Sequence, residues 1–395
     1  MFLEMESMNN QNKSQFDYYL LLIILLLMII STINIQSAQK FLPYTANFTG
    51  QQVIRFIVGI VMSSVIYYFD FEQIKRLSFY AYLFGVLMLV ALFFAPSSIA
   101  PVIKGAKAWF ALGIAGTLQP SEFMKVFLIL FLAKITVDHN YKTINRTLST
   151  DFLLIGKIVG ITAIPLLFIL KQPDAGTAMV IVAIMFGIII VSGVNWKLLV
   201  IFFSSVISVI GAFVYIYIYY PDTLLLVLDQ YQIERIDSWL DPFEYRGGIG
   251  YQLSQSILAI GSGTTSGKGY SNAEVIIPEA HSDFIFSVIG EEYGFLGSSV
   301  VVTLYFLLIY RIIRISLKNK GEYESLISAG VISMLTFHIF ENIGMVSGLV
   351  PITGIPLPLL SYGGSSIFGT VLALTLILNI SAKTKFYMFD GNKYE

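Results

Sequence analysis

The ionisable residues best suited to catalysis lie close together in one segment, 277–297, which reads IPEAHSDFIFSVIGEEYGFLG. Asp283 directly precedes an apolar Phe-Ile-Phe stretch, so we expect its carboxyl at the boundary between lipid headgroups and hydrocarbon. Partial desolvation there would raise the pKa of the carboxyl, as a general base requires. The structural alternative is that Asp283 caps a helix that starts beside it. Glu291, two turns further on, could pair with a cation.

A metal site in the same segment is a further alternative. His281 and Asp283 are two residues apart, a spacing that does not place them on one face of a helix. The chain contains no cysteine, which excludes disulfides and thiolate ligands. We therefore assign no metal-binding residues.

Three charged residues fall within apolar runs, where ionisable groups are costly and usually functional. Arg55 lies in the run 52–69, and Glu122 and Lys125 open the run 120–137 on one helix face. One interpretation is a neutralised packing contact in which Glu122 pairs with Lys125 or Arg55. The other is a cationic wall that binds an anionic headgroup, such as a pyrophosphate, through charge-assisted hydrogen bonds. The two interpretations are compatible.

The segment 337–366 contains prolines and glycines that preclude a continuous helix. Irregular backbone at membrane depth is tolerated only where it is buried in protein or lines a cavity. Ser361, Ser365 and Ser366 could there donate hydrogen bonds to a phosphate or a sugar.

Two further residues have a structural and a functional interpretation. Asp174, in the sequence KQPDAGTAMV, is expected to cap the start of a helix, with Thr177 three residues on. Trp109 offers an amphipathic ring, which would either anchor the chain at the membrane interface or stack on a sugar.

The composition identifies the elements that must position these residues. Hydrophobic residues make up 56% of the 395 positions and charged residues only 12%, against about a quarter in soluble domains. Several apolar runs reach the roughly 20 residues that a bilayer requires. We predict an all-α polytopic integral membrane protein of about ten transmembrane helices. The expected spans are 18–37, 52–69, 77–95, 120–137, 152–170, 175–193, 197–219, 284–314 (a short interfacial helix and then a span), 324–346 and 362–382.

The distribution of Lys and Arg between the loops predicts the orientation. Cationic residues are more numerous in the connections on the side of the two termini, which favours a cytoplasmic location for both ends. Two long loops, about 96–119 and 220–283, then face outward, the larger one between the seventh and eighth spans. Loops of this length without evident structure are usually functional. We expect a single membrane domain over residues 1–395, with no cleavable signal peptide.

Composition and motifs also exclude other classes of protein. A net charge of −1 argues against a nucleic-acid partner. The sequence GSGTTSGKGY superficially suggests a nucleotide-binding loop, but Gly269 follows Lys268 where Ser or Thr is required. An ATP-driven pump is therefore disfavoured.

Five motifs in order resemble the SEDS family of bacterial envelope proteins, which includes the elongation member RodA, the division member FtsW and SpoVE. They are GAKAWFALGIAGTLQPSEFMKV (105–126), QPDAGTAMV (172–180), GYQLSQSILAIGSG (250–263), EAHSDFIFSVIGEEYGFLG (279–297) and NIGMVSGLVPITGIPLPLLSYGGSS (342–366). The short tails and the GIPLPLLSYGGSS motif look more like RodA, with FtsW as the alternative. The chain departs from the family pattern at Ala175, in GSGTTSGKG, and at His338 with Glu341.

The resemblance implies a ten-span fold and a peptidoglycan glycosyltransferase of the bacterial cytoplasmic membrane, with its site on the outer face. The implied substrate is lipid II, a disaccharide-pentapeptide on undecaprenyl pyrophosphate, and the implied partner is a class B penicillin-binding protein that crosslinks the product. The family's essential aspartate corresponds to Asp283, which is implied as the catalytic base. Substrate-binding residues would be Arg55, Trp109, Glu122, Lys125, Lys268, Ser361 and Ser365, supported by Asp174, Glu291 and Asn342.

The implied reaction joins two lipid-linked sugars. Asp283 would take the proton of an acceptor 4-hydroxyl, whose oxygen attacks the anomeric carbon of the donor, and the pyrophosphate leaves with inversion. Cations would stabilise the leaving group. A divalent cation, Mg²⁺ or Mn²⁺, could share this role, although no ligand cluster demands one. The alternatives are a lipid II flippase, which should carry a charge pair or broken helix near the midplane, and a non-enzymatic scaffold.

Overall fold

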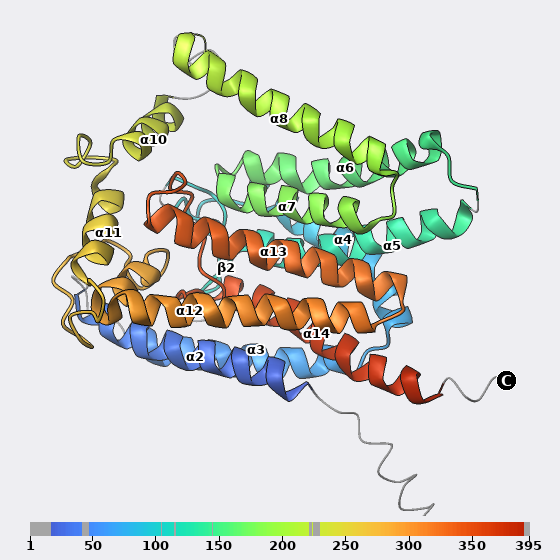
Figure 1. Cartoon of the computed structure of the whole chain (residues 1–395), viewed down its shortest axis with the longest axis horizontal. Helices are drawn as coiled ribbons and strands as arrows, with labels where there is room; N and C mark the ends of the chain where they lie inside the picture. Colours follow the sequence, from blue (N-terminus) through green and yellow to red (C-terminus); the bar gives the residue numbers. More distant parts are fainter. Residues whose placement is uncertain are drawn as a thin grey trace, which may run out of the picture.

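The computed structural model describes residues 17–41, 47–103, 105–113, 116–143, 145–220, 223 and 230–390, the side chains of 230–232 and 384–390 excepted. Each predicted span coincides with one long helix (Figure 1). These helices are α2 (Tyr18–Ala38), α3 (Phe48–Tyr67), α4 (Phe71–Phe94), α5 (Pro120–Lys142), α6 (Leu148–Leu170), α7 (Ala175–Val191), α8 (Trp196–Tyr219), α12 (Ile285–Lys318), α13 (Glu322–Val346) and α14 (Ser365–Asp390).

Eight helices in the described part of the chain are long and apolar enough to cross a membrane. The two long helices outside that set are α5 and α7. Helix α7 has only 17 residues, and α5 carries the charged residues Glu122, Lys125, Lys134 and Asp138. Helix α5 packs against α4, α6, α7, α13 and α14, so protein rather than lipid surrounds it. A central position explains how a helix with this polarity sits inside the bundle.

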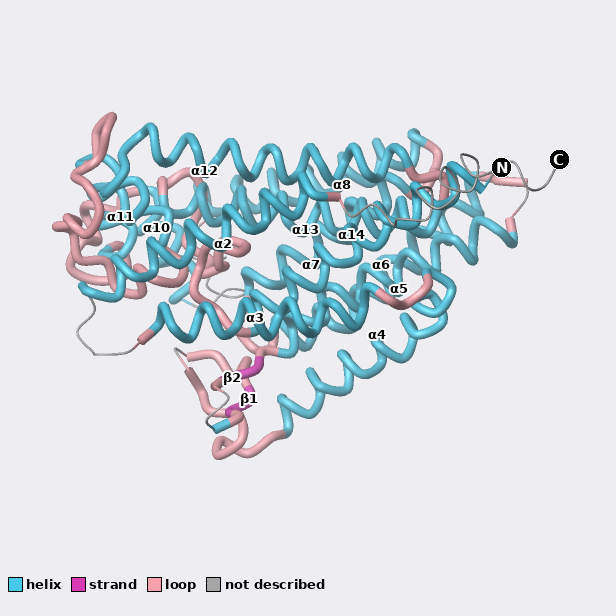
Figure 2. The backbone as a smooth tube through the Cα atoms, turned by 90° about the horizontal axis from the view of Figure 1, so that it is seen from below, coloured by secondary structure: helices cyan, strands magenta, loops and turns pink. Residues whose placement is uncertain are grey.

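Helix α2 begins and α14 ends at the same end of the bundle, and the long connections lie at the opposite end (Figures 1 and 2). We call the first the terminal end and the second the loop end. Helix α8 lies apart from the bundle, packs against α6 and buries none of its residues. Helices α4, α6, α7, α13 and α14 pack against α5, while α2 packs on α12 and α3 on α14.

The loop end is more ordered than the sequence predicts. A two-stranded antiparallel hairpin, β1 (Phe110–Ala111) with β2 (Thr117–Leu118), occupies the first long loop. The second holds two helices, α10 (Gln230–Leu240) and α11 (Tyr251–Ser262). Both long loops therefore contain regular structure that the sequence patterns do not reveal. Helix α11 buries Leu253 and Ala259 and packs on α12, a tertiary contact that no local pattern reveals.

Helix α12 breaks at Gly294, whose backbone has a φ of 63° and a ψ of −156°. The expected short helix followed by a span is thus confirmed. The loop after α11 bonds to the broken region, because the amides of Lys268 and Gly269 donate to the carbonyls of Glu291 and Glu292 at 3.0 and 2.9 Å. These two hydrogen bonds therefore hold the large loop against α12, next to the break in the helix.

Close packing of α7 on α13 depends on Gly187. A Cβ added there would overlap Ser333 Oγ and lie 3.3 Å from the carbonyl oxygen of Ala329. We expect Gly187→Val to force these helices apart and to destabilise the protein by about 1–3 kcal/mol. Thermal unfolding in detergent measures the loss. Gly211→Val on α8 is the control, since nothing lies within 4 Å of that site. An equal effect of both substitutions would contradict this packing.

Candidate functional site

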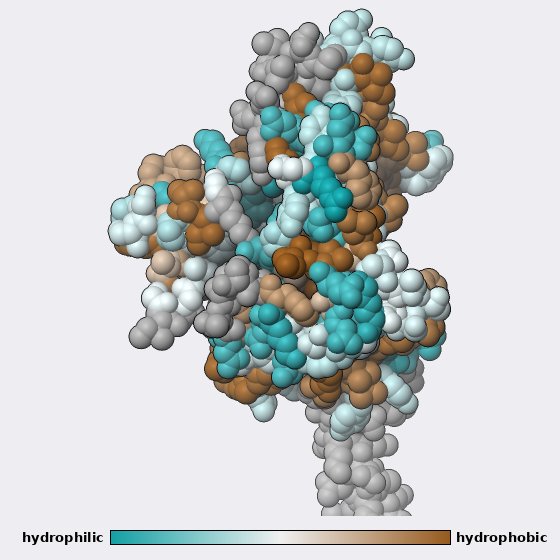
Figure 3. Space-filling view, turned by 90° about the vertical axis from the view of Figure 1, so that its left-hand side faces the viewer, coloured by the Kyte–Doolittle hydropathy of each residue, from teal (hydrophilic) through white to brown (hydrophobic). Residues whose placement is uncertain are grey.

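The candidate site lies at the loop end, where the irregular segment between α13 and α14 meets the start of α12. Figure 3 faces this end and shows hydrophilic residues interspersed with hydrophobic ones over it. Gly354, with a φ of 75°, lies beside the proposed base, because a Cβ added to it would be 3.6 Å from Asp283 Oδ2. The side chain of Asp283 is partly exposed. The carboxyl therefore faces the irregular segment at a position that solvent reaches.

Asn342 holds the backbone beside Asp283 and beside Gly354, the two residues that lie close together here. Its amide nitrogen donates to the carbonyl oxygens of Asp283 and Ile355, each at 2.8 Å, from a fully buried position on α13. Helix α12 begins at Ile285 with Phe284 as its N-cap. Asp283 is therefore not the N-cap of α12. Its backbone carbonyl is held by the hydrogen bond from Asn342.

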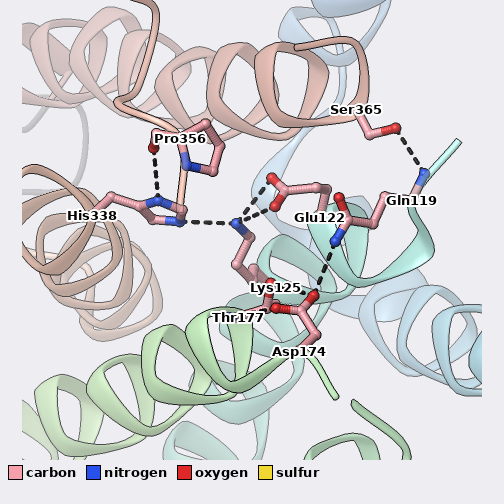
Figure 4. A network of polar contacts seen from close by, with 8 residues as sticks. All are labelled: Gln119, Glu122, Lys125, Asp174, Thr177, His338, Pro356 and Ser365. Atoms are coloured by element: carbon pink, nitrogen blue, oxygen red, sulfur yellow. Dashed lines mark hydrogen bonds and ion pairs between the residues drawn. The ribbon is translucent and has the colours of Figure 1, made fainter. Parts of the chain in front are cut away.

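Glu122 and Lys125 form a buried ion pair in the first turns of α5 (Figure 4). Lys125 Nζ lies 2.9 Å from both carboxylate oxygens of Glu122 and 2.9 Å from Nε2 of His338. An ammonium can only donate, so Nε2 accepts and Nδ1 carries the proton toward the carbonyl oxygen of Pro356, 3.4 Å away. Lys125 is only 2% exposed. The expected neutralised packing contact is confirmed by this buried pair.

A second chain of polar contacts joins α5, α7 and α14. Ser365 Oγ accepts from the amide of Gln119 at 2.8 Å, and the side-chain amide of Gln119 donates to Asp174 at 3.0 Å (Figure 4). Asp174 also accepts from the amide and the hydroxyl of Thr177, which confirms its role as the N-cap of α7. Gln119 was not expected from the sequence, because its partners come from distant segments.

Arg55 projects from α3 toward the start of α14. Its guanidinium lies over the ring of Tyr362, 4.1 Å from the centroid. A Cβ added to Gly364 would be 3.6 Å from Arg55 Nε, so the absent side chain leaves room beside the guanidinium. Arg55 Nη1 has no hydrogen-bond partner within the described residues. Arg55 therefore holds this buried, unpaired donor next to the N-terminus of a long helix, where anions are favoured.

Lys268 and Glu291 are paired, as expected for Glu291. The two side chains meet at 2.7 Å, and the same Glu291 oxygen accepts from the amides of Glu274 and Val275. The hydrogen bond to Glu291 raises the pKa of Lys268, which keeps the ammonium charged throughout the neutral range. This pair closes the large loop on α12 rather than presenting a free cation.

The remaining expected residues take structural positions. Ser361 is buried, and its hydroxyl accepts from the amide of Leu357 at 2.7 Å. Trp109 is partly exposed and directly precedes β1. His281 is buried and stacks on Phe48, with centroids 4.3 Å apart. Among the described residues, no group of three or more acidic or histidine side chains could hold a metal ion. The described residues therefore offer no such ligand set, and no step is assigned to a divalent cation.

The fold and the site define a polytopic membrane protein with a polar site at one end of its helical bundle. The family model of the FtsW, RodA and SpoVE cell cycle proteins matches residues 14–386. The chain belongs to this family, so the expected SEDS membership is confirmed.

Relatives and a solved structure agree with this assignment. A probable peptidoglycan glycosyltransferase FtsW from Trichlorobacter lovleyi is 33% identical over 367 residues, covering 92% of this chain and 91% of the relative. The peptidoglycan glycosyltransferase MrdB of Escherichia coli is 32% identical over 314 residues, 78% of each chain. A structure described as coordination of polymerization and crosslinking by a peptidoglycan synthase complex has a TM-score of 0.78 at 26% identity, covering 94% of this chain and 98% of that one. The all-α membrane fold is confirmed.

Loss of the Glu291 carboxylate should release the large loop. Glu291→Gln weakens three contacts at a buried oxygen, so we expect faster tryptic cleavage after Lys268 in the reconstituted protein. Glu274→Gln is the matched control, because Glu274 is 79% exposed and such surface pairs contribute little. Equal cleavage rates in both variants would contradict the anchoring role of Glu291.

Proposed function

We propose that this chain is a peptidoglycan glycosyltransferase that polymerises lipid II, with Asp283 as the general base. The observation that carries the proposal is the placement of a partly exposed carboxyl against the irregular 351–364 segment, at the end of the bundle that also presents Arg55. The names of the family relatives support the reaction class. Lipid-linked sugars would reach such a site from the membrane surface.

The proposed step uses the groups of this chain and the two substrates alone. The Asp283 carboxylate removes the proton from the 4-hydroxyl of the acceptor GlcNAc. The freed oxygen forms a bond to the anomeric carbon of the donor MurNAc, and the bond from that carbon to the pyrophosphate oxygen breaks with inversion. The proton on Asp283 then passes to water. A positioned base of this kind contributes about 10²–10⁴-fold to a rate.

Arg55 is the proposed partner of the leaving pyrophosphate. Its unpaired Nη1 donor, which is buried among the described residues, and the N-terminus of α14 beside Gly364 would bind the charge that develops as the bond breaks. Ser365 retains its hydroxyl proton for a phosphate or sugar oxygen, since its oxygen accepts from Gln119. Trp109 is proposed as a sugar-stacking ring.

The other expected residues support the site. Lys125 and Glu122 are closed off from solvent, so we propose that they hold α5 against α13 beneath the site. Ser361 and Asn342 shape the irregular segment, and Asp174 fixes the start of α7. Lys268 and Glu291 hold the large loop.

The setting of the reaction is likewise a proposal. Both termini would be cytoplasmic and the loop end extracytoplasmic, as the cationic loops predict. A class B penicillin-binding protein would crosslink the product, in keeping with the synthase complex whose fold this chain shares. The elongation branch is favoured by the sequence motifs, while identity to the FtsW and MrdB relatives is nearly equal at 33% and 32%.

A lipid II flippase is the second candidate, because Glu122–Lys125 is a buried charge pair of the kind a carrier would use. The pair lies in the first turns of α5, is buried, and contacts His338. Scrambling of fluorescent lipid II in liposomes, measured beside polymerisation, separates the two activities. We expect polymer without scrambling, and scrambling without polymer would contradict the proposal.

Asp283→Asn should abolish polymerisation of lipid II by purified protein. The amide cannot take up the proton, so we expect a loss of about 10²–10⁴-fold in glycan formation with unchanged thermal unfolding. Asp241→Asn is the control, an equivalent change at an exposed loop position. Retention of polymerisation by folded Asp283→Asn protein would remove Asp283 from the role of base.

Arg55→Met should weaken stabilisation of the leaving group. Loss of charge-assisted hydrogen bonds of about 1.5–3 kcal/mol predicts a fall in kcat/KM of about 10–100-fold. Arg55→Lys keeps the charge and should recover part of the rate. Lys40→Met, which removes another cation of the loop end, serves as the control. If Arg55→Met polymerised as fast as that control, the proposed pyrophosphate contact would be wrong.

A further inference from the structure

An apolar cavity of about 280 Å³ opens between α2, α3 and α14, in the half of the bundle away from the candidate site. We call it the α2–α3–α14 groove. Its floor includes Ser63, Leu374 and Leu378, which are at most 8% exposed. Leu25 and Ile60 on its walls are 41% and 48% exposed, so the groove opens sideways on the surface that faces lipid.

Small side chains create the hollow. Gly59 brings α3 against α14, because a Cβ added there would be only 3.6 Å from Phe368 and 3.7 Å from Val371. One turn further along α3, Ser63 lines the groove together with Thr375 of α14. The two helices thus touch at Gly59 and leave space below it, toward the terminal end.

Two of the hydroxyl groups that line the groove are already hydrogen-bonded and need no polar ligand. The hydroxyls of Ser64 and Thr375 donate to the carbonyl oxygens of Val61 and Val371 within their own helices. A transmembrane helix of about 10–12 Å diameter is too wide for a cavity of this size. At bilayer depth, a single hydrocarbon chain is the remaining occupant, and it would supply the dispersion contacts that an empty hollow loses.

The two ends of the groove indicate where such a chain enters. Toward Arg55, the contact of Gly59 with Phe368 and Val371 closes the groove, so a lipid tail descending from the candidate site does not run along this interface. At the other end the lining includes Tyr67 and Tyr68, and Tyr68 is 82% exposed. Tyrosines of this kind mark the level of the headgroups. Entry is therefore from the leaflet at the terminal end.

We propose that the α2–α3–α14 groove binds one acyl chain of a phospholipid of that leaflet, with its headgroup beside Tyr67 and Tyr68. The bound chain completes the packing of α2 and α3 on α14. This site is separate from the sugar-transfer site, and its occupation does not depend on which reaction the loop end performs.

Photo-crosslinking tests the site in the full-length protein. The protein is reconstituted in vesicles of phosphatidylethanolamine and phosphatidylglycerol that contain a small fraction of phospholipid with a diazirine in one acyl chain. Adducts are mapped by mass spectrometry. We expect more adduct per residue at Ser63, Leu374 and Leu378 than at Ile207 of α8, although Ile207 is 68% exposed. Labelling in proportion to exposure would overturn the proposal.

Variants that fill the hollow provide the second arm. Ser63→Trp and, independently, Thr375→Met should abolish the adducts at Leu374 and Leu378, whereas Ser63→Ala should keep them. Unchanged adducts at Ile207 show that each variant is inserted and folded. Excess unlabelled phospholipid should compete. Displacement by undecaprenyl phosphate but not by phospholipid would overturn the assignment, as would groove adducts that survive both filling substitutions.

Discussion

The site depends on how an irregular backbone inside a membrane protein satisfies its carbonyl groups. Unpaired peptide groups at this depth cost several kcal/mol each, because no water is at hand. Asn342 and His338 lie one turn apart on α13 and face successive carbonyls of the irregular segment, those of Ile355 and Pro356. The same Asn342 amide also bonds to the carbonyl of Asp283. One helix face therefore holds the segment and the carboxyl together.

This arrangement links the site to the core of the bundle. His338 contacts the carbonyl of Pro356 in the segment and also accepts from Lys125, which pairs with Glu122. The charge pair of α5 is therefore hydrogen-bonded to a group that also supports the site. On the other side, Ser365 and Gln119 connect the start of α14 with Asp174 at the start of α7. Three helices that meet at the loop end are thus joined by buried polar contacts, which cost little to keep only when every member is paired.

Much of the fold could be predicted because membrane-spanning helices are specified locally. Long apolar runs located the spans, and Asp174 with Thr177 has a local capping pattern that the structure confirms. The pairing of Glu122 with Lys125 followed from their spacing along one helix. Helices α10 and α11, the hairpin, and the contacts of Arg55 with Tyr362 and of Gln119 with Asp174 depend on segments far apart in the sequence. Periodicity and spacing carry no information about such pairs. For the same reason, the hydrogen bond from Lys125 to His338 was not expected.

Replacement of Asn342 tests most directly whether its buried amide positions Asp283, the carboxyl proposed as the general base. Asn379 is the matched control, an equally buried asparagine whose amide donates to the carbonyl of Phe69 at the terminal end. Lipid II polymerisation and thermal unfolding are measured for Asn342→Ala and Asn379→Ala. Asn342→Ala should lose more stability, since it removes the donor to two carbonyls at about 1–3 kcal/mol apiece. In Asn379→Ala the carbonyl of Phe69 still accepts from Lys383 Nζ, so the loss should be smaller. The account predicts that only Asn342→Ala loses polymerisation in the protein that remains folded. Equal polymerisation by the two variants would contradict it.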